Sequence, residues 1–175
     1  MQPASKEQTT FLRLLDQYQP ALWRLVNAYE QDASRRDDLF QEIALNVWQA
    51  LPRFRGDSSE RTWLYRIAHN VAISGMQSRR RTERRETPIA DSLDPPHAGA
   101  LSDELMAARE KHEALLAAIR ELPALDRGLI ILHLEGLSYQ EIEQIAGLSE
   151  SAIGSRLTRI RGRLTELICE KGARR

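Results

Sequence analysis

Hydroxyl and guanidinium side chains share one face of segment 149–168. A stripe spaced three or four residues apart predicts the buried side of a helix there: Ile153, Leu157, Ile160, Leu164 and Ile168. At about 100° per residue, the opposite side and its flanks carry Ser151, Ser155, Thr158, Arg159, Arg156, Arg161 and Arg163. Such groups can donate hydrogen bonds to base edges and phosphates of duplex DNA. The pattern equally suits a helix with a solvated basic face, and this segment alone leaves both interpretations open.

The residues just before this helix predict a second helix and a tight turn. Ser138 and Glu141 have the spacing of a capping box, in which each side chain bonds the other's free backbone N–H. Gly147 suits a helix stop that needs positive φ, and Ser149 can cap the next helix. The segment 138–168 is therefore predicted to be a helical hairpin that could enter a DNA groove.

A second candidate for nucleic-acid binding lies earlier in the chain. Residues 78–85 hold five arginines, at the end of a predicted helix that begins with Trp63 and Tyr65. Cations beside aromatic rings suit single-stranded DNA, which binds through backbone phosphates and base stacking. The alternative is that both rings belong to the core, and for Tyr65 we favour that alternative.

The sequence offers no arrangement typical of an enzyme. The four histidines are scattered, no pair has metal-ligand spacing, and no glycine-rich phosphate loop or nucleophile motif occurs. Asp37, Asp38 and Glu42 could be paired carboxylates, but acids near a helix start are more simply a solvated face. We expect no catalytic residue, no metal site and no cofactor.

The elements that position these residues are all predicted to be helical. We expect an all-α protein with two small domains, residues 1–86 and 101–175, joined by a proline-rich acidic linker over 87–100. Pro20 predicts a break between two early helices, since proline is disfavoured inside a helix. In the second domain, a four-helix unit, Asp126 can cap the short helix that precedes the hairpin.

Charge is balanced overall but uneven along the chain. The net charge is zero, yet residues 51–85 hold nine basic and three acidic residues, and residues 86–126 hold three basic and nine acidic ones. Zero net charge weakens long-range attraction to DNA, so we do not expect tight unaided binding. Cys169 is the only cysteine, and no apolar run approaches the roughly 20 residues of a membrane span. With no segment resembling a secretion signal, we expect a cytoplasmic protein without membrane insertion.

Three ordered motifs resemble those of a bacterial extracytoplasmic-function sigma factor of the sigma-70 family. They are DDLFQE at 37–42, FRGDSSERTWLYRIAHN at 54–70 and GLSYQEI at 136–142. The resemblance runs from about residue 10 to residue 168. It implies a subunit that binds core RNA polymerase and promoter DNA and starts transcription at chosen promoters, under the control of an anti-sigma factor.

The resemblance also implies roles for individual residues. Polymerase docking falls on Asp38, Leu39, Gln41 and Glu42. Recognition and melting of the minus-ten element are assigned to the first domain. The residues expected to bind this element are Phe54, Arg55, Gly56, Asp57, Ser58, Ser59, Trp63, Asn70, Arg79, Arg80 and Arg81. Recognition of the minus-thirty-five element falls on the hairpin, where we count Ser151, Ser155, Arg156 and Arg159. The acidic linker would thread toward the polymerase cleft and mimic the charge of nucleic acid there.

Three positions depart from the family pattern. Glu60 stands where an aromatic residue is common, Gly154 where a basic one is common, and Ala152 where a hydroxyl residue is commoner. Two other functions compete with the sigma factor: a free-standing helix-turn-helix regulator, and an adaptor that binds only proteins. A simple regulator needs no docking helix or arginine run, and an adaptor does not explain two separated basic blocks.

Overall fold

The computed structural model describes residues 6–83 and 103–172, and within these ranges the chain is helical without strands. The N-terminal unit holds α1 (Lys6–Tyr29), α2 (Ala33–Ala50), the short 3-10 helix η1 (Leu51–Arg53) and α3 (Glu60–Glu83). The C-terminal unit holds α4 (Asp103–Glu121), α5 (Ala124–Leu134), α6 (Tyr139–Ala146) and α7 (Glu150–Gly172). The all-α prediction and the four-helix C-terminal unit are confirmed. The predicted linker 87–100 and the domain end at residue 86 lie outside the described ranges.

The early helix is continuous, so the predicted break at Pro20 is wrong. Pro20 lies inside α1 and is exposed. Proline removes one N–H of the helix, but on a solvent-facing side the carbonyl left without that donor can bond water. The buried residues on both sides of Pro20, including Leu14, Leu22 and Leu25, hold the helix against the core.

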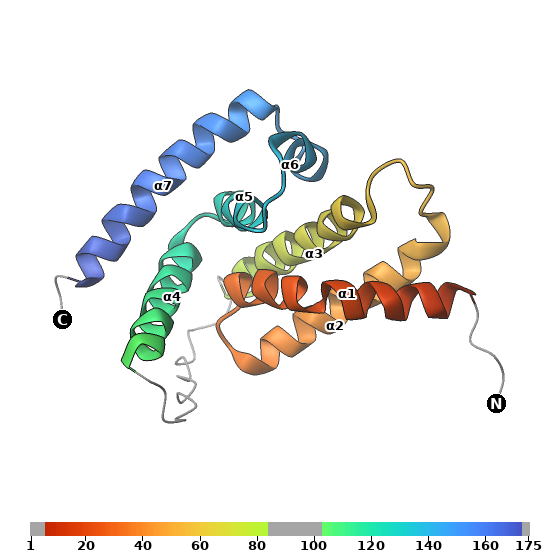
Figure 1. Cartoon of the computed structure of the whole chain (residues 1–175), viewed down its shortest axis with the longest axis horizontal. Coiled ribbons are helices and arrows are strands. Elements are labelled where there is room, and N and C mark those ends of the chain that lie inside the picture. The colour runs from red at the N-terminus through yellow and green to blue at the C-terminus, as the bar shows by residue number, and fades with distance from the viewer. Residues whose placement is uncertain (1–5, 84–102, 173–175) are drawn as a thin grey trace.

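Helix α3 lies between the other helices of its own unit and the C-terminal unit (Figure 1). It packs against α1 and α2 on one side and against α5 and α6 on the other. Buried residues of both units form one hydrophobic cluster, to which Leu64 and Ala68 of α3 and Leu129 and Leu132 of α5 all belong. The two predicted domains therefore share an extensive interface.

Two expected details of the C-terminal unit are corrected. Asp126 lies in the first turn of α5 and does not cap it, because the N-cap position is Pro123. On α7, Leu167 is buried and Ile168 is 37% exposed. The buried residues Ile153, Leu157, Ile160 and Leu164 alternate steps of four and three, and this alternation continues at Leu167, so Leu167 takes the core position that the prediction gave to Ile168.

Candidate protein and nucleic-acid interfaces

The predicted hairpin forms as expected. Ser138 Oγ accepts from the Glu141 N–H at 3.2 Å, and the Glu141 carboxylate accepts from the Ser138 N–H at 2.8 Å. Gly147 ends α6 with φ of 69°, a left-handed conformation that favours glycine. Ser149 Oγ accepts from the Ala152 N–H at 3.3 Å at the start of α7. Gly147 at the end of α6 and Ser149 at the start of α7 thus define the turn that orients α7.

The polar face of α7 is open to solvent. Ser151, Ser155 and Arg159 are exposed, whereas Ile153, Leu157 and Ile160 are buried beneath them. A Cβ built on Gly154 would lie 3.4 Å from Tyr139 Cε2, which is an ordinary contact. A larger residue would therefore fit at position 154, so steric crowding does not explain why glycine stands there.

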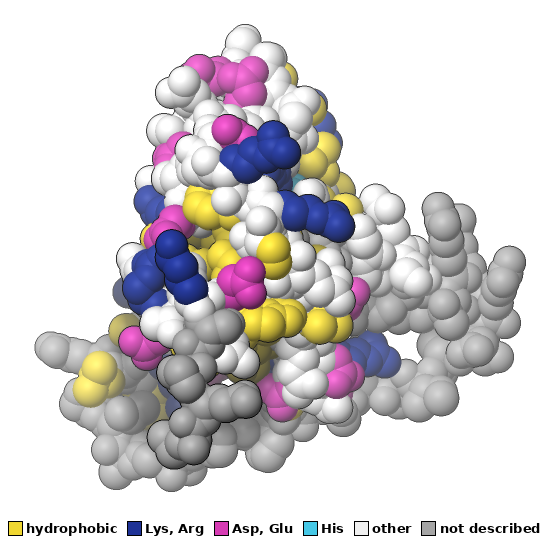
Figure 2. All heavy atoms as spheres, turned by 90° about the vertical axis from the view of Figure 1, so that its right-hand side faces the viewer, with side chains coloured by type: hydrophobic (Ala, Val, Ile, Leu, Met, Phe, Trp, Pro, Cys, Tyr) yellow, Lys and Arg dark blue, Asp and Glu magenta, His cyan; other side chains and the backbone are white. Residues whose placement is uncertain are grey.

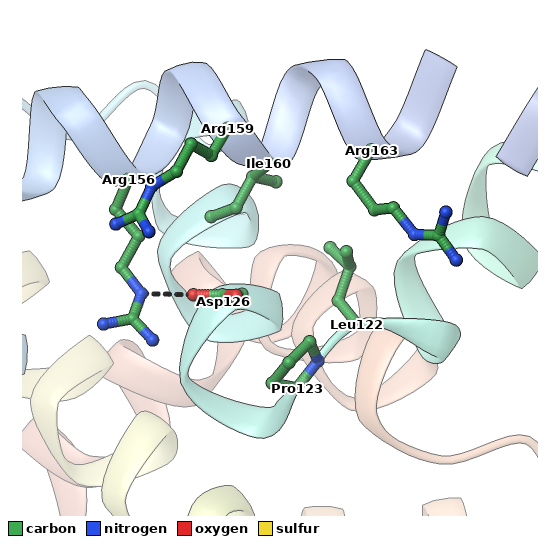
Figure 3. Close-up of a pocket in the computed structure, with 7 residues that line it drawn as sticks. All are labelled: Leu122, Pro123, Asp126, Arg156, Arg159, Ile160 and Arg163. Atoms are coloured by element: carbon green, nitrogen blue, oxygen red, sulfur yellow. Dashed lines mark hydrogen bonds and ion pairs between the residues drawn. The ribbon is translucent and has the colours of Figure 1, made fainter. Parts of the chain in front are cut away.

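Arg156 is held differently from the other predicted DNA contacts. It forms an ion pair with Asp126 at the start of α5, and the two side chains are 34% and 19% exposed. Figure 3 shows Arg156, Arg159 and Arg163 around a hollow of about 320 Å³, with Leu122, Pro123 and Ile160 on its apolar side. The structure therefore brings Ser151, Ser155 and Arg159 together on the exposed face and ties Arg156 to the body of the unit.

The loop 54–59, assigned by resemblance to the minus-ten element, connects η1 to α3. Gly56 has φ of 80°, and the Ser59 hydroxyl accepts from the Thr62 N–H at 3.0 Å where α3 begins. The Phe54 and Trp63 ring centroids lie 4.8 Å apart, and Trp63 is only 6% exposed. A small hollow of about 60 Å³ opens beside the two rings, lined also by Arg53, Arg55, Asp57, Ser58 and Arg66. An aromatic wall with guanidinium groups around it can hold the face of a base beside its phosphate.

Glu60, which also departs from the family pattern, binds α1 and does not line this hollow. Its carboxylate accepts from Arg13 at 2.6 and 3.1 Å. Asn70 is exposed further along α3, whose last turns include Arg79, Arg80 and Arg81. The side chains of those three arginines lie outside the described part of the structure.

The exposed side of α2 carries most of the predicted docking residues. Asp38, Gln41 and Glu42 are exposed, whereas Leu39 is 3% exposed and packs in the core. The same side continues into Leu45 and Trp48, which are 54% and 37% exposed. Trp48 lies seven residues after Gln41, which is about two helical turns, so it belongs to the exposed side of α2.

The described residues show neither metal-binding nor membrane-spanning features. In this part of the chain, no three His, Cys, Asp or Glu side chains gather as a metal site would require. None of its helices combines the length and apolar character needed to cross a bilayer. On the face shown in Figure 2, acidic and basic side chains are interspersed around hydrophobic atoms.

Comparison with known proteins finds a sigma-70 family match in each of the two units. Residues 14–82 match the family model Sigma-70 region 2, and residues 112–164 match Sigma-70, region 4. The chain is 32% identical over 147 residues to the ECF RNA polymerase sigma factor SigX of Bacillus subtilis, covering 82% of this chain and 76% of SigX. It is also 32% identical over 162 residues to the ECF RNA polymerase sigma-E factor of Escherichia coli, covering 89% and 84%.

Solved structures extend the likeness to three dimensions. The sigma factor RpoE in complex with the anti-sigma factor NepR from Bartonella quintana matches with a TM-score of 0.71 and 26% identity, covering 91% of this chain and 96% of RpoE. CnrH in complex with the cytosolic domain of CnrY matches with a TM-score of 0.66 and 24% identity, covering 95% and 92%. The CnrH likeness concerns the fold alone.

Proposed function

Because this chain belongs to the ECF RNA polymerase sigma factors of the sigma-70 family, we propose that its two units direct core polymerase to promoters through the surfaces described above. Residues 1–86 serve as region 2, residues 87–100 as the linker and residues 101–175 as region 4. The exposed polar face of α7, carried on a capped hairpin, is the observation that supports this assignment most directly.

Polymerase docking is assigned to the exposed side of α2. Asp38, Gln41 and Glu42 offer acidic and amide groups to a partner surface, and Leu39 supports them from the core. A face that combines charge with exposed apolar groups suits a protein partner better than it suits DNA, whose phosphates an acidic group repels.

Promoter recognition is assigned to two surfaces. The loop 54–59 with Trp63 holds an extruded base of the minus-ten element, while Asn70, Arg79, Arg80 and Arg81 extend that surface along α3. Extrusion of a base costs a few kcal/mol, which contacts in the hollow must offset. Ser151, Ser155 and Arg159 read the minus-thirty-five duplex, and Arg156 supports them through Asp126.

The protein acts as a transcription initiation factor and not as an enzyme. We place it in the cytoplasm, where core polymerase and promoter DNA are present, and assign it no cofactor. Its balanced charge supports a dependence on polymerase for tight DNA binding, since a field of mixed sign attracts phosphate weakly.

An anti-sigma factor is the proposed regulator of this chain. The similar RpoE was solved with the anti-sigma factor NepR, and the match to RpoE spans both units. A pull-down from the native host with the intact chain as bait tests this partner; recovery of polymerase without any inhibitory protein would contradict it.

Run-off transcription tests the proposed function. Purified core polymerase is supplied with genomic fragments, with and without the chain, and we expect promoter-specific transcripts only in its presence. A free-standing regulator would leave the transcripts of core polymerase unchanged, and an adaptor would add none.

A further inference from the structure

Arg13 of α1 and Glu60, the first residue of α3, form a two-point ion pair. The Arg13 nitrogens Nη2 and Nη1 donate to the two oxygens of the Glu60 carboxylate, at 2.6 and 3.1 Å. Arg13 Nη1 also donates to the Gln17 side-chain oxygen at 3.2 Å, one turn further along α1. A two-point pair fixes the relative orientation of its partners as well as their separation. The pair therefore determines how the start of α3 lies against α1.

The loop 54–59 lies between two elements that both pack against α1. Helix α1 contacts η1, which precedes the loop, and α3, which follows it. Glu60 is the residue next to the loop, and Trp63 of the minus-ten hollow follows Glu60 by three residues, nearly one turn of α3. A shift of Glu60 therefore moves both the end of the loop and the Trp63 ring.

The first turn of α3 carries the position of Glu60 to the hollow. The Ser59 hydroxyl accepts from the Thr62 N–H, and the Ser59 carbonyl accepts from the Trp63 N–H, both at 3.0 Å. A carboxylate in this turn also interacts favourably with the free N–H groups at the start of the helix. The last residue of the loop is thus bonded to the same turn that Arg13 holds.

The α1 side of the pair stands on a fixed backbone. Leu14, next to Arg13, is fully buried. The ring of Phe11 packs edge-on against Trp48 of α2, with centroids 5.2 Å apart. The loop 54–59, by contrast, belongs to no helix. Because the fixed element constrains the looser one, Arg13 positions the start of α3 rather than the reverse.

The pair is suited to orient the loop more than to stabilise the fold. The Arg13 and Glu60 side chains are 49% and 37% exposed. Ion pairs in contact with solvent add little to the free energy of unfolding. Their geometry still restricts the backbone, because a displaced Glu60 loses both hydrogen bonds at once. Removal of the pair is therefore expected to alter the minus-ten hollow without unfolding the unit.

We propose that Arg13 is a positioning residue for promoter opening: through Glu60 it holds the loop 54–59 and the start of α3 in the arrangement that receives an extruded minus-ten base. This inference rests on the proposed function for the role of the hollow, and on the contacts above for the pair. Arg13 acts through Glu60 and does not itself bind DNA. Its effect falls on the opening step, since the hollow is needed only when a base leaves the duplex.

Neutral substitutions at the two positions test the pair from both sides. Arg13→Gln and Glu60→Gln each remove one charge and keep a polar side chain. The exchanged pair, Arg13→Glu with Glu60→Arg, restores opposite charges in reversed order. The matched control is Glu113→Gln, which removes the acid of the exposed Arg109–Glu113 pair within α4.

Promoter opening by the holoenzyme, assembled from core polymerase and the full chain, is the readout. A fluorescent adenine analogue in the minus-ten element reports the opening rate, and titration of the same fragment reports initial binding. We expect Arg13→Gln and Glu60→Gln each to slow opening about threefold, which an exposed ion pair can account for, with initial binding unchanged. The double neutral variant should be no slower than either single one, because both substitutions remove the same contact. The exchanged pair should recover most of the lost rate.

The controls separate positioning from other roles. Glu113→Gln should open promoters at the unmodified rate, and denaturant unfolding checks that every variant folds. A slow Arg13→Gln beside a Glu60→Gln that opens promoters at the unmodified rate or faster would overturn the proposal, because Arg13 would then bind DNA itself. An exchanged pair no faster than the neutral variants, or neutral variants at the unmodified rate, would overturn it too. If the unmodified holoenzyme opened no promoter, the proposed function would be contradicted instead.

Discussion

Arg156 of α7 forms an ion pair with Asp126 of α5. Arg159 follows Arg156 by three residues on the same helix and is exposed. The pair joins α7 to the body of its unit. One arginine therefore holds α7 in place, whereas the side chain of the other is exposed to solvent.

Alanine substitution should separate these two roles. Arg159→Ala should weaken promoter use by about 1 to 3 kcal/mol, the cost of losing a bidentate base contact, while leaving stability unchanged. Arg156→Ala should instead lower the free energy of unfolding by about 1 kcal/mol, because the pair is partly exposed. Transcription from a set of single-base promoter variants and denaturant unfolding measure the two effects. Equal loss of base discrimination in both variants would contradict the separate roles given to Arg156 and Arg159.

Reversal of charge on α2 should impair polymerase binding. Asp38→Lys should weaken the affinity for core polymerase about tenfold, as loss of one favourable interface charge and gain of a repulsive one would. Asp37→Lys, at the neighbouring exposed position, is the matched control for charge. Fluorescence titration with core polymerase measures both, and equal effects would show that position 38 has no special role.

Truncation of the aromatic wall should impair promoter melting. Phe54→Ala removes the ring that lies 4.8 Å from Trp63 and should slow open-complex formation on duplex DNA. A template whose minus-ten element is already unpaired should restore the rate, because the cost of extruding the base is then absent. A defect that persists on the unpaired template would show that the loop acts elsewhere.

Gly154→Ala should stabilise the protein. Alanine is favoured over glycine inside a helix by about 1 kcal/mol, and the new methyl group meets only Tyr139 at 3.4 Å. We expect the free energy of unfolding to rise by about 0.5 to 1 kcal/mol in denaturant titration, as in the control Gly162→Ala. A loss of stability confined to Gly154→Ala would reveal crowding on α7.

Acid should weaken the fold through His69. Burial lowers the pKa of His69 to about 4, whereas an unfolded histidine titrates near about 6.5. Between these values the unfolded chain binds more protons, so the free energy of unfolding falls as pH decreases from about 6.5 toward 4, by on the order of 2 kcal/mol. His69→Phe should flatten this slope, and His112→Gln on the exposed part of α4 should not. An unchanged slope in His69→Phe would contradict the role of the buried ring.

Local patterns predicted the hairpin and missed contacts between distant segments. Ser138, Glu141 and Gly147 act on neighbours within a few residues, so their spacing alone predicts the cap and the stop. The break predicted at Pro20 is wrong because the effect of a proline depends on whether its side of α1 faces solvent, which tertiary packing decides.

The same limit applies to the candidate site. Spacing predicted the exposed face of α7, and the family resemblance pointed to the loop 54–59, but neither could assign Asp126 to Arg156, thirty residues away in sequence. It also gave no sign that Glu135 meets Arg24, because neither residue belongs to a local motif. Ion pairs between distant segments depend on how the helices pack, and a single sequence carries no direct signal of helix packing.

Hydroxyl-radical footprinting of a polymerase complex tests the central claim most directly. On a promoter that depends on this chain, we predict two protected segments about 25 base pairs apart, about 85 Å of duplex, only when both core polymerase and the chain are present. Arg159→Ala should remove the upstream protection and spare the downstream one. Protection by the chain without polymerase, or a single protected segment in the full complex, would contradict the account.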